Sequence, residues 1–172
     1  MKRATLFIAV VLLGVVGTIT VMAKGLPSFV TVEGANLNAP ITLEAQPVME
    51  LLNPWLGDFA QWDRPIEQAM LSVDDSYQIN IYLELEDEVE PRLIYVFYYH
   101  PNWNGEHGMV YLPGQGEAWY TLNSSTIYMH EGGKWYTATP ELDSALRPIL
   151  TEAAPAPSIW QRLLLLLINL LR

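Results

Sequence analysis

The strongest constraint on the fold is a pair of strand-like segments in the middle of the chain. From Ser76 to Glu86, apolar or aromatic residues occupy the odd positions and mostly polar residues the even ones. This period of two is the pattern of a β-strand that buries one face and wets the other. The next run, Arg92 to Tyr99, is apolar at both parities, which predicts a central strand covered on both faces. Residues 87–91 between them predict a hairpin turn.

Shorter segments extend this pattern to a whole domain. Apolar residues at helical spacing predict two helical regions, residues 47–62, interrupted at Pro54, and residues 139–150, with Thr139 as N-cap. Further strands are predicted at 29–33 paired with 40–44, at 109–112, at 119–122, and at 126–131 paired with 134–139 across two glycines. We therefore expect an α+β domain, with an antiparallel sheet of about five to seven strands and two short helical regions packed on it.

The N-terminal segment has the composition of a membrane-inserting segment. Residues 4–23 contain no charge and follow Lys2 and Arg3. Such a run is long enough to cross a bilayer, and the flanking positive charges favour a cytoplasmic N-terminus with the domain outside. Alternatively, the segment is a signal peptide that is cleaved after Ala23, and the protein is secreted. Residues 1–27 are thus predicted as a signal anchor or signal peptide, and residues 28–150 as an extracytoplasmic β-rich domain.

The C-terminus is also apolar. Residues 151–158 form a Pro/Ala linker, and residues 159–172 place their polar side chains on one narrow stripe of a helix. The apolar stretch would span only about 20 Å, too short to cross a bilayer. We expect this amphipathic helix to lie in the membrane interface, or alternatively to dock onto protein. The predicted membrane contacts are Trp160, Leu163, Leu164, Leu167, Ile168 and Leu171.

Composition excludes several classes of site and partner. The chain has no cysteine, so disulfides and thiolate metal sites are excluded. With 19 acidic and 9 basic residues its formal net charge is −10, and it lacks the basic footprint that nucleic-acid binding requires. No cofactor is predicted.

The most suggestive cluster of chemical groups follows the central strand. His100, Glu106 and His107 lie in a loop that joins two predicted strands. If those strands pair, two imidazoles and a carboxylate meet at one end of the sheet and could ligate a metal such as zinc. The spacing matches no standard metal motif, and the alternative is that these histidines simply end strands. His130 and Glu131 begin an H-E-x-x-H pattern that lacks its second histidine.

Two other signals concern ligands and modification. Six tryptophans and nine tyrosines are present, and an exposed subset such as Tyr82 and Trp103 could form a stacking platform for a glycan or a peptide. Core packing is the alternative for these aromatic residues. Asn123 begins an N-glycosylation acceptor pattern, and Ser124 and Ser125 precede His130 without the surroundings of a catalytic serine.

Together these features predict a membrane-associated extracytoplasmic binding or interaction module, and not an enzyme. Its partner would be an unidentified protein or surface polymer, with membrane contact through residues 4–23 and, in one alternative, 159–172. A second hypothesis is a metal-dependent hydrolase that uses His100, Glu106 and His107. A third is an accessory subunit of a membrane complex that docks through the C-terminal helix.

Overall fold

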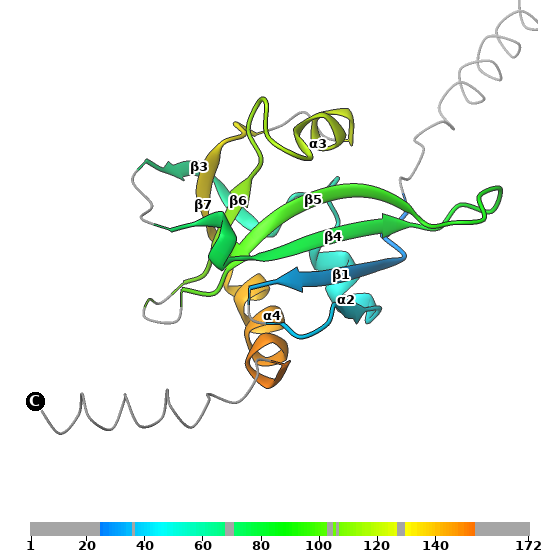
Figure 1. The fold of residues 1–172 in the computed structure, drawn as a ribbon, viewed down its shortest axis with the longest axis horizontal. Helices are drawn as coiled ribbons and strands as arrows, with labels where there is room; N and C mark the ends of the chain where they lie inside the picture. Colours follow the sequence, from blue (N-terminus) through cyan, green and yellow to red (C-terminus); the bar gives the residue numbers. More distant parts are fainter. Residues whose placement is uncertain are drawn as a thin grey trace, which may run out of the picture.

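The protein folds as one antiparallel sheet with helices packed on it (Figure 1). The computed structural model describes residues 25–35, 37–67, 71–102, 105, 107–126 and 130–153. Its seven strands lie in the order β2-β1-β4-β5-β6-β7-β3, which confirms the expected α+β class and the antiparallel sheet. In chain order the elements are β1 (Phe29–Gly34), β2 (Ile41–Leu43), α2 (Gln46–Leu51), β3 (Ala60–Ile66), the 3₁₀ turn η1 (Val73–Asp75), β4 (Tyr77–Leu83), β5 (Arg92–His100), β6 (Met109–Leu112), α3 (Tyr120–Thr126), β7 (Lys134–Ala138) and α4 (Pro140–Ala153).

The two central strands pair as the sequence predicts. β4 and β5 are antiparallel, with Ile79 opposite Phe97 and Ile81 opposite Tyr95. The odd side chains of β4 enter the core, and residues 94–97 of β5 are buried at both parities. The other face of β4 is drier than expected, because Asn80 is only 2% exposed. Its amide donates to Thr31 and accepts from Gln78, so the buried polar group is satisfied.

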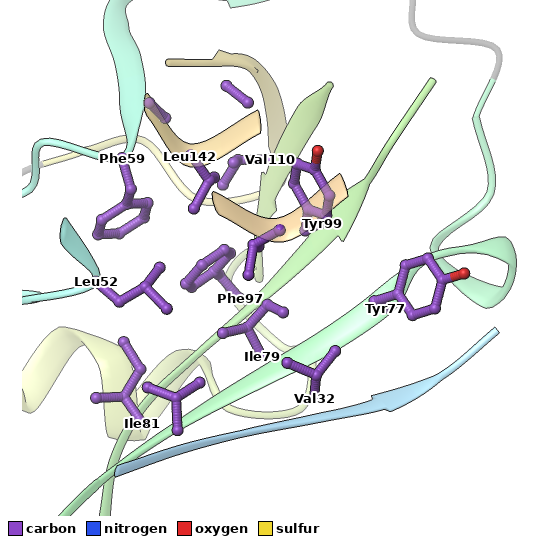
Figure 2. Packing of buried hydrophobic residues seen from close by; sticks show 14 of the residues in the cluster. Val32, Leu52, Phe59, Tyr77, Ile79, Ile81, Phe97, Tyr99, Val110 and Leu142 are labelled. Carbon is purple, nitrogen blue, oxygen red and sulfur yellow. The ribbon is translucent and has the colours of Figure 1, made fainter. Parts of the chain in front are cut away.

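The main core lies between the sheet and helices α2 and α4 (Figure 2). Leu142, Leu146 and Leu150 recur every four residues on α4, and all three are fully buried. This spacing places them on one helical face against the sheet. Phe59, from the loop before β3, stacks on Phe97 with ring centroids 4.7 Å apart. The helix begins as predicted, because the hydroxyl of Thr139 accepts from the backbone N–H of Leu142 at 3.3 Å.

Two strand predictions differ from the structure. Residues 119–122 do not form a strand, because residues 120–122 belong to helix α3. Of the predicted strand at 126–131, Thr126 ends α3 and residues 127–129 lie outside the described residues, while β7 pairs with β6 and β3. A short apolar run is ambiguous between strand and helix, and the neighbours decide. Here both edges of β7 are occupied, since Trp135 lies opposite Tyr111 of β6 and opposite Ile66 of β3.

The first helical region is shorter than predicted. Only α2, residues 46–51, is helical, and Trp62 lies in β3. Beyond the expected break at Pro54, Gly57 takes a positive φ of 72° that turns the chain into the strand. Phe59 and Trp62 are three residues apart, as on one face of a helix, but here they are both apolar because their rings pack edge to face, with centroids 5.1 Å apart.

The two segments predicted to contact a membrane, residues 4–23 and 159–172, lie outside the described residues. Within the described part, no helix has the length and apolar character needed to cross a membrane. Helix α4 continues to Ala153, three residues into the predicted linker. The six predicted membrane contacts between Trp160 and Leu171 also fall outside the described part.

Candidate functional site

The candidate site forms where two neighbouring strands diverge. β4 pairs with β5 along residues 92–99, whereas β6 pairs only with residues 98–100 of β5. Among the described residues, therefore, no strand lies beside the edge of β5 from residue 92 to 97. A free edge of this kind leaves backbone N–H and C=O groups that need other partners.

Helix α3 supplies these partners with side chains. The amide of Asn123 accepts from the backbone N–H of Val96 at 2.9 Å and donates to its carbonyl at 2.6 Å. The hydroxyl of Thr126 donates to the carbonyl of Ile94 at 2.6 Å. Asn123 thus takes the place of a strand peptide group, which holds α3 against β5. Since Asn123 is only 7% exposed and its amide bonds both backbone groups of Val96, it is a structural group here and not an accessible glycosylation acceptor.

The space between the diverging strands is a cavity of about 460 Å³, which we call the fork cavity. This size falls within the usual range for small-molecule sites. Its walls come from β5, the end of β6, α3 and the loop before β7. The lining residues with the most chemistry are Tyr95, Tyr120, Ser124, His130 and Glu131, with Leu112 among the apolar ones.

His130 is fixed in this wall by stacking. Its ring lies parallel to the indole of Trp62, with centroids 4.3 Å apart and an interplanar angle of 9°. Trp62 is held in turn, since its indole N–H donates to the carbonyl of Gly57 and its ring packs edge-on against Tyr136. The Nε2 atom of His130 is buried and has no hydrogen-bond partner among the described residues. Burial lowers the pKa of His130 below its usual value, so the ring is neutral at pH 7.

Tyr95 brings a phenol to the fork cavity from the core side of β5. Its ring packs edge-on against Phe59, with centroids 6.3 Å apart. Burial, and secondarily the neighbouring Tyr136, raise the pKa of Tyr95, so its hydroxyl stays protonated and can donate. The fork cavity therefore combines aromatic surfaces with a few polar groups.

The fork cavity does not hold an activated nucleophile in the part of the chain described. Ser124 and His130 line the same space, but the Ser124 hydroxyl donates to the backbone carbonyl of Thr121 at 3.1 Å. Nucleophilic catalysis needs the hydroxyl to bond its base, and the base to bond an orienting group. The arrangement suits binding better than acyl transfer.

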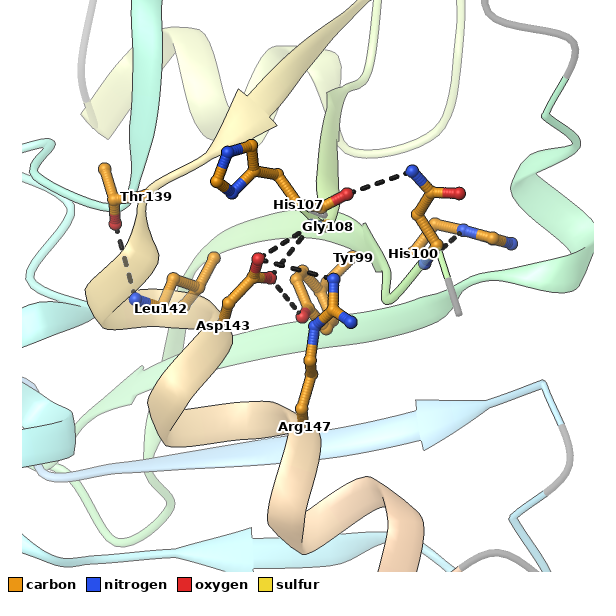
Figure 3. A network of polar contacts seen from close by, with 9 residues as sticks. Tyr99, His100, His107, Gly108, Thr139, Leu142, Asp143 and Arg147 are labelled. Carbon is orange, nitrogen blue, oxygen red and sulfur yellow. Dashed lines mark hydrogen bonds and ion pairs between the residues drawn. The ribbon is translucent and has the colours of Figure 1, made fainter. Parts of the chain in front are cut away.

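The predicted metal cluster is brought together only in part. β5 and β6 do pair as the hairpin that the hypothesis required, with His100 opposite Met109. However, the Nδ1 atom of His100 accepts from the backbone N–H of Asn102 at 2.9 Å, and Figure 3 shows the two imidazoles of His100 and His107 pointing in different directions. Glu106 lies outside the described residues, and the described residues contain no group of three potential ligands close enough to hold a metal.

The proposed aromatic platform is likewise divided. Tyr82 stacks on Phe29 of the neighbouring strand, with centroids 4.8 Å apart and planes 12° from parallel. Its ring therefore serves as one half of a cross-strand pair, whose other half covers one of its faces. Trp103 lies outside the described residues.

A second polar cluster, which the sequence did not reveal, is structural. Asp143 in the first turn of α4 is 7% exposed and accepts from the hydroxyl of Tyr99 at 2.6 Å (Figure 3). It also accepts from the backbone N–H of Gly108 at 2.8 Å, and Arg147 lies 3.5 Å away. A carboxylate with its oxygens engaged in this way fastens the β5–β6 loop to α4.

The residues of the fork cavity were visible in the sequence only as fragments of motifs. Ser124, His130 and Glu131 match parts of catalytic and metal patterns that they do not complete. Tyr95 and Tyr120 were indistinguishable from core aromatics. The missing signal was the divergence of β5 from β6, which depends on tertiary pairing.

No protein-family model, curated protein or solved structure matches this chain.

Proposed function

We propose that this protein is a membrane-associated extracytoplasmic binding module that takes a small ligand into the fork cavity. The observation that carries the proposal is the cavity itself, whose size, aromatic walls and few polar groups are those of a small-molecule site. The hydrogen bonds of α3 to β5 favour a preformed cavity, because they fix one wall to the sheet. Such preorganisation lowers the cost of binding.

Binding without catalysis is the form of the proposal that the side chains favour. The Ser124 hydroxyl is committed to Thr121, and His130 is stacked on Trp62 rather than bonded to a nucleophile. The metal-dependent hydrolase built on His100 and His107 has weaker support, because one nitrogen of His100 already accepts a backbone hydrogen bond.

The location in the proposal rests on residues 4–23. An uncharged apolar run preceded by basic residues would hold the domain at the outer face of a membrane, or direct its secretion if cleaved. Resistance of the membrane-bound chain to alkaline carbonate extraction would distinguish an uncleaved anchor from a released domain.

The binding proposal is tested by filling the fork cavity. The full-length chain, in maltoside micelles, is screened by ligand-observed NMR against a library of small neutral and charged fragments. Ser124→Phe places a large ring in the cavity wall and should abolish the hits. Ser125→Phe is the matched control, because Ser125 is the next residue of α3, is exposed, and does not line the cavity.

Two outcomes would contradict the proposal. One is an absence of fragment hits with the folded wild-type chain. The other is a set of hits that Ser124→Phe leaves unchanged while its circular dichroism spectrum matches that of the control.

A further inference from the structure

Several polar groups of the fork cavity can accept hydrogen bonds from a ligand. The Ser124 hydroxyl donates its proton to Thr121, so its oxygen is left to accept, and the Glu131 carboxylate only accepts. The hydroxyls of Tyr95 and Tyr120 and the amide of Gln115 can each donate and accept. A ligand that donates hydrogen bonds therefore finds acceptors in this lining.

The charge of the lining favours a cationic ligand over an anionic one. Glu131 lines the fork cavity, and neither lysine nor arginine is among the described residues that line it. His130 adds no positive charge, because burial lowers its pKa. Glu131 Oε1 lies 3.8 Å from Lys134 Nζ, but this carboxylate is 69% exposed, and exposed ion pairs are weak enough for a ligand cation to replace. An anion entering the cavity would find no cationic partner in its walls.

Aromatic faces complete the environment. Tyr95, Tyr120 and the neutral ring of His130 line the same space. The two tyrosine rings attract a cation placed over their faces. Aromatic walls with one carboxylate and spare acceptors are the chemistry that recognises an organic ammonium ion.

We propose that the fork cavity binds an alkylammonium group, with its charge near Glu131 and the aromatic rings and its N–H groups donated to the spare acceptors. This inference rests on the proposed function and narrows it to one ligand class. The ammonium group belongs either to a free amine or to a lysine side chain, and both carry the same chemistry.

The test compares three probes of nearly equal shape. The full-length chain in maltoside micelles, with ¹³C-labelled tyrosine rings, is titrated with n-butylammonium, n-butanol and butyrate. The ring signals of Tyr95 and Tyr120 report on the cavity. We expect n-butylammonium to bind about two- to fivefold more tightly than n-butanol, and butyrate more weakly than both. The preference for the cation should shrink as salt is added.

A carboxylate variant tests the assigned group. Glu131→Gln should remove most of the preference for n-butylammonium over n-butanol while leaving n-butanol binding unchanged. Glu152→Gln on α4 is the matched control, since it makes the same change in net charge outside the cavity lining and should leave the preference intact. A parallel titration with Nα-acetyl-lysine amide separates the sources, because tighter binding than n-butylammonium assigns the amine to a peptide and weaker binding assigns it to a free amine.

The results separate this inference from the proposed function. If n-butanol or butyrate binds as tightly as n-butylammonium, or if Glu131→Gln keeps the preference, the ammonium assignment is overturned while the fork cavity remains a binding site. If no probe moves the tyrosine signals and the fragment screen also fails, both are overturned.

Discussion

The carboxylate of Asp143 gives the sharpest test of how this fold is held together. It lies in the first turn of α4 and accepts hydrogen bonds from two groups of the β5–β6 hairpin, the Tyr99 hydroxyl and the Gly108 backbone N–H. Asp143→Ala removes the acceptor and leaves both donors buried without partners. Asp143→Asn keeps the shape and one acceptor oxygen but removes the charge.

The expected cost follows from the number of orphaned groups. A buried donor without a partner costs about 1–3 kcal/mol, so two of them give about 2–6 kcal/mol for Asp143→Ala. The Arg147 contact at 3.5 Å adds little, because it is long and Arg147 is partly exposed. Asp143→Asn should cost about 1–2 kcal/mol, since its oxygen accepts from one donor and the Tyr99 hydroxyl can accept from its amide.

The assay is urea unfolding of the full-length chain in micelles, followed by near-ultraviolet circular dichroism. The midpoint should fall in the order wild type, Asp143→Asn, Asp143→Ala, with an unchanged slope. Glu141→Ala, an exposed change in the same helical turn, is the control and should cost under about 1 kcal/mol. If Asp143→Ala lies within about 1 kcal/mol of this control, the carboxylate does not fasten α4 to the β5–β6 loop, and the reasoning fails.

Three further predictions concern the fork cavity and its surroundings. Asn123→Ala should lower the free energy of unfolding by about 2–4 kcal/mol and speed hydrogen exchange of the Val96 amide, because both backbone groups of Val96 lose their partner. Ser125→Ala on the same helix should have little effect, and equal exchange rates of the Val96 amide in the two variants would contradict the prediction. Because burial lowers the pKa of His130, the unfolded chain binds its proton first as the pH falls, so the free energy of unfolding should decrease below about pH 6.5. His130→Gln should flatten this decrease, as measured by urea midpoints between about pH 5 and 8, and an unchanged slope would refute the assignment. Burial and the hydrogen bond to Glu117 raise the pKa of Tyr111 to about 12. Glu117→Gln should therefore lower the pKa of Tyr111 only partway toward its ordinary value in an NMR titration. An unchanged pKa would show that Glu117 has no part in the shift.

The central sheet was predictable because its signal is local. Alternation along residues 76–86 requires one buried face, and the apolar run from Arg92 requires two, whatever the rest of the chain does. The N-terminus of α4 was predictable for a similar reason, since Thr139 and Pro140 act on the backbone within one turn. Each of these features depends on residues that are close in sequence.

The errors came where distant neighbours decide the structure. Residues 119–122 are apolar enough for a strand, yet residues 120–122 begin helix α3, in which Asn123 and Thr126 satisfy the open edge of β5. Phe59 and Trp62 share a helical spacing but lie in a loop and a strand, because both side chains reach the same core. Short windows carry no record of such long-range partners.

For the candidate site, too, local sequence features and long-range contacts contribute separately. The sequence by itself determined an antiparallel α+β domain, a strongly acidic chain without cysteine, and an uncharged apolar segment at residues 4–23, since these follow from residue type and local period. Only the tertiary structure decided that β5 parts from β6 after three paired residues and that α3 bridges the gap. The fork cavity exists because of that pairing length, which long-range backbone hydrogen bonds and core packing set jointly and no local pattern encodes.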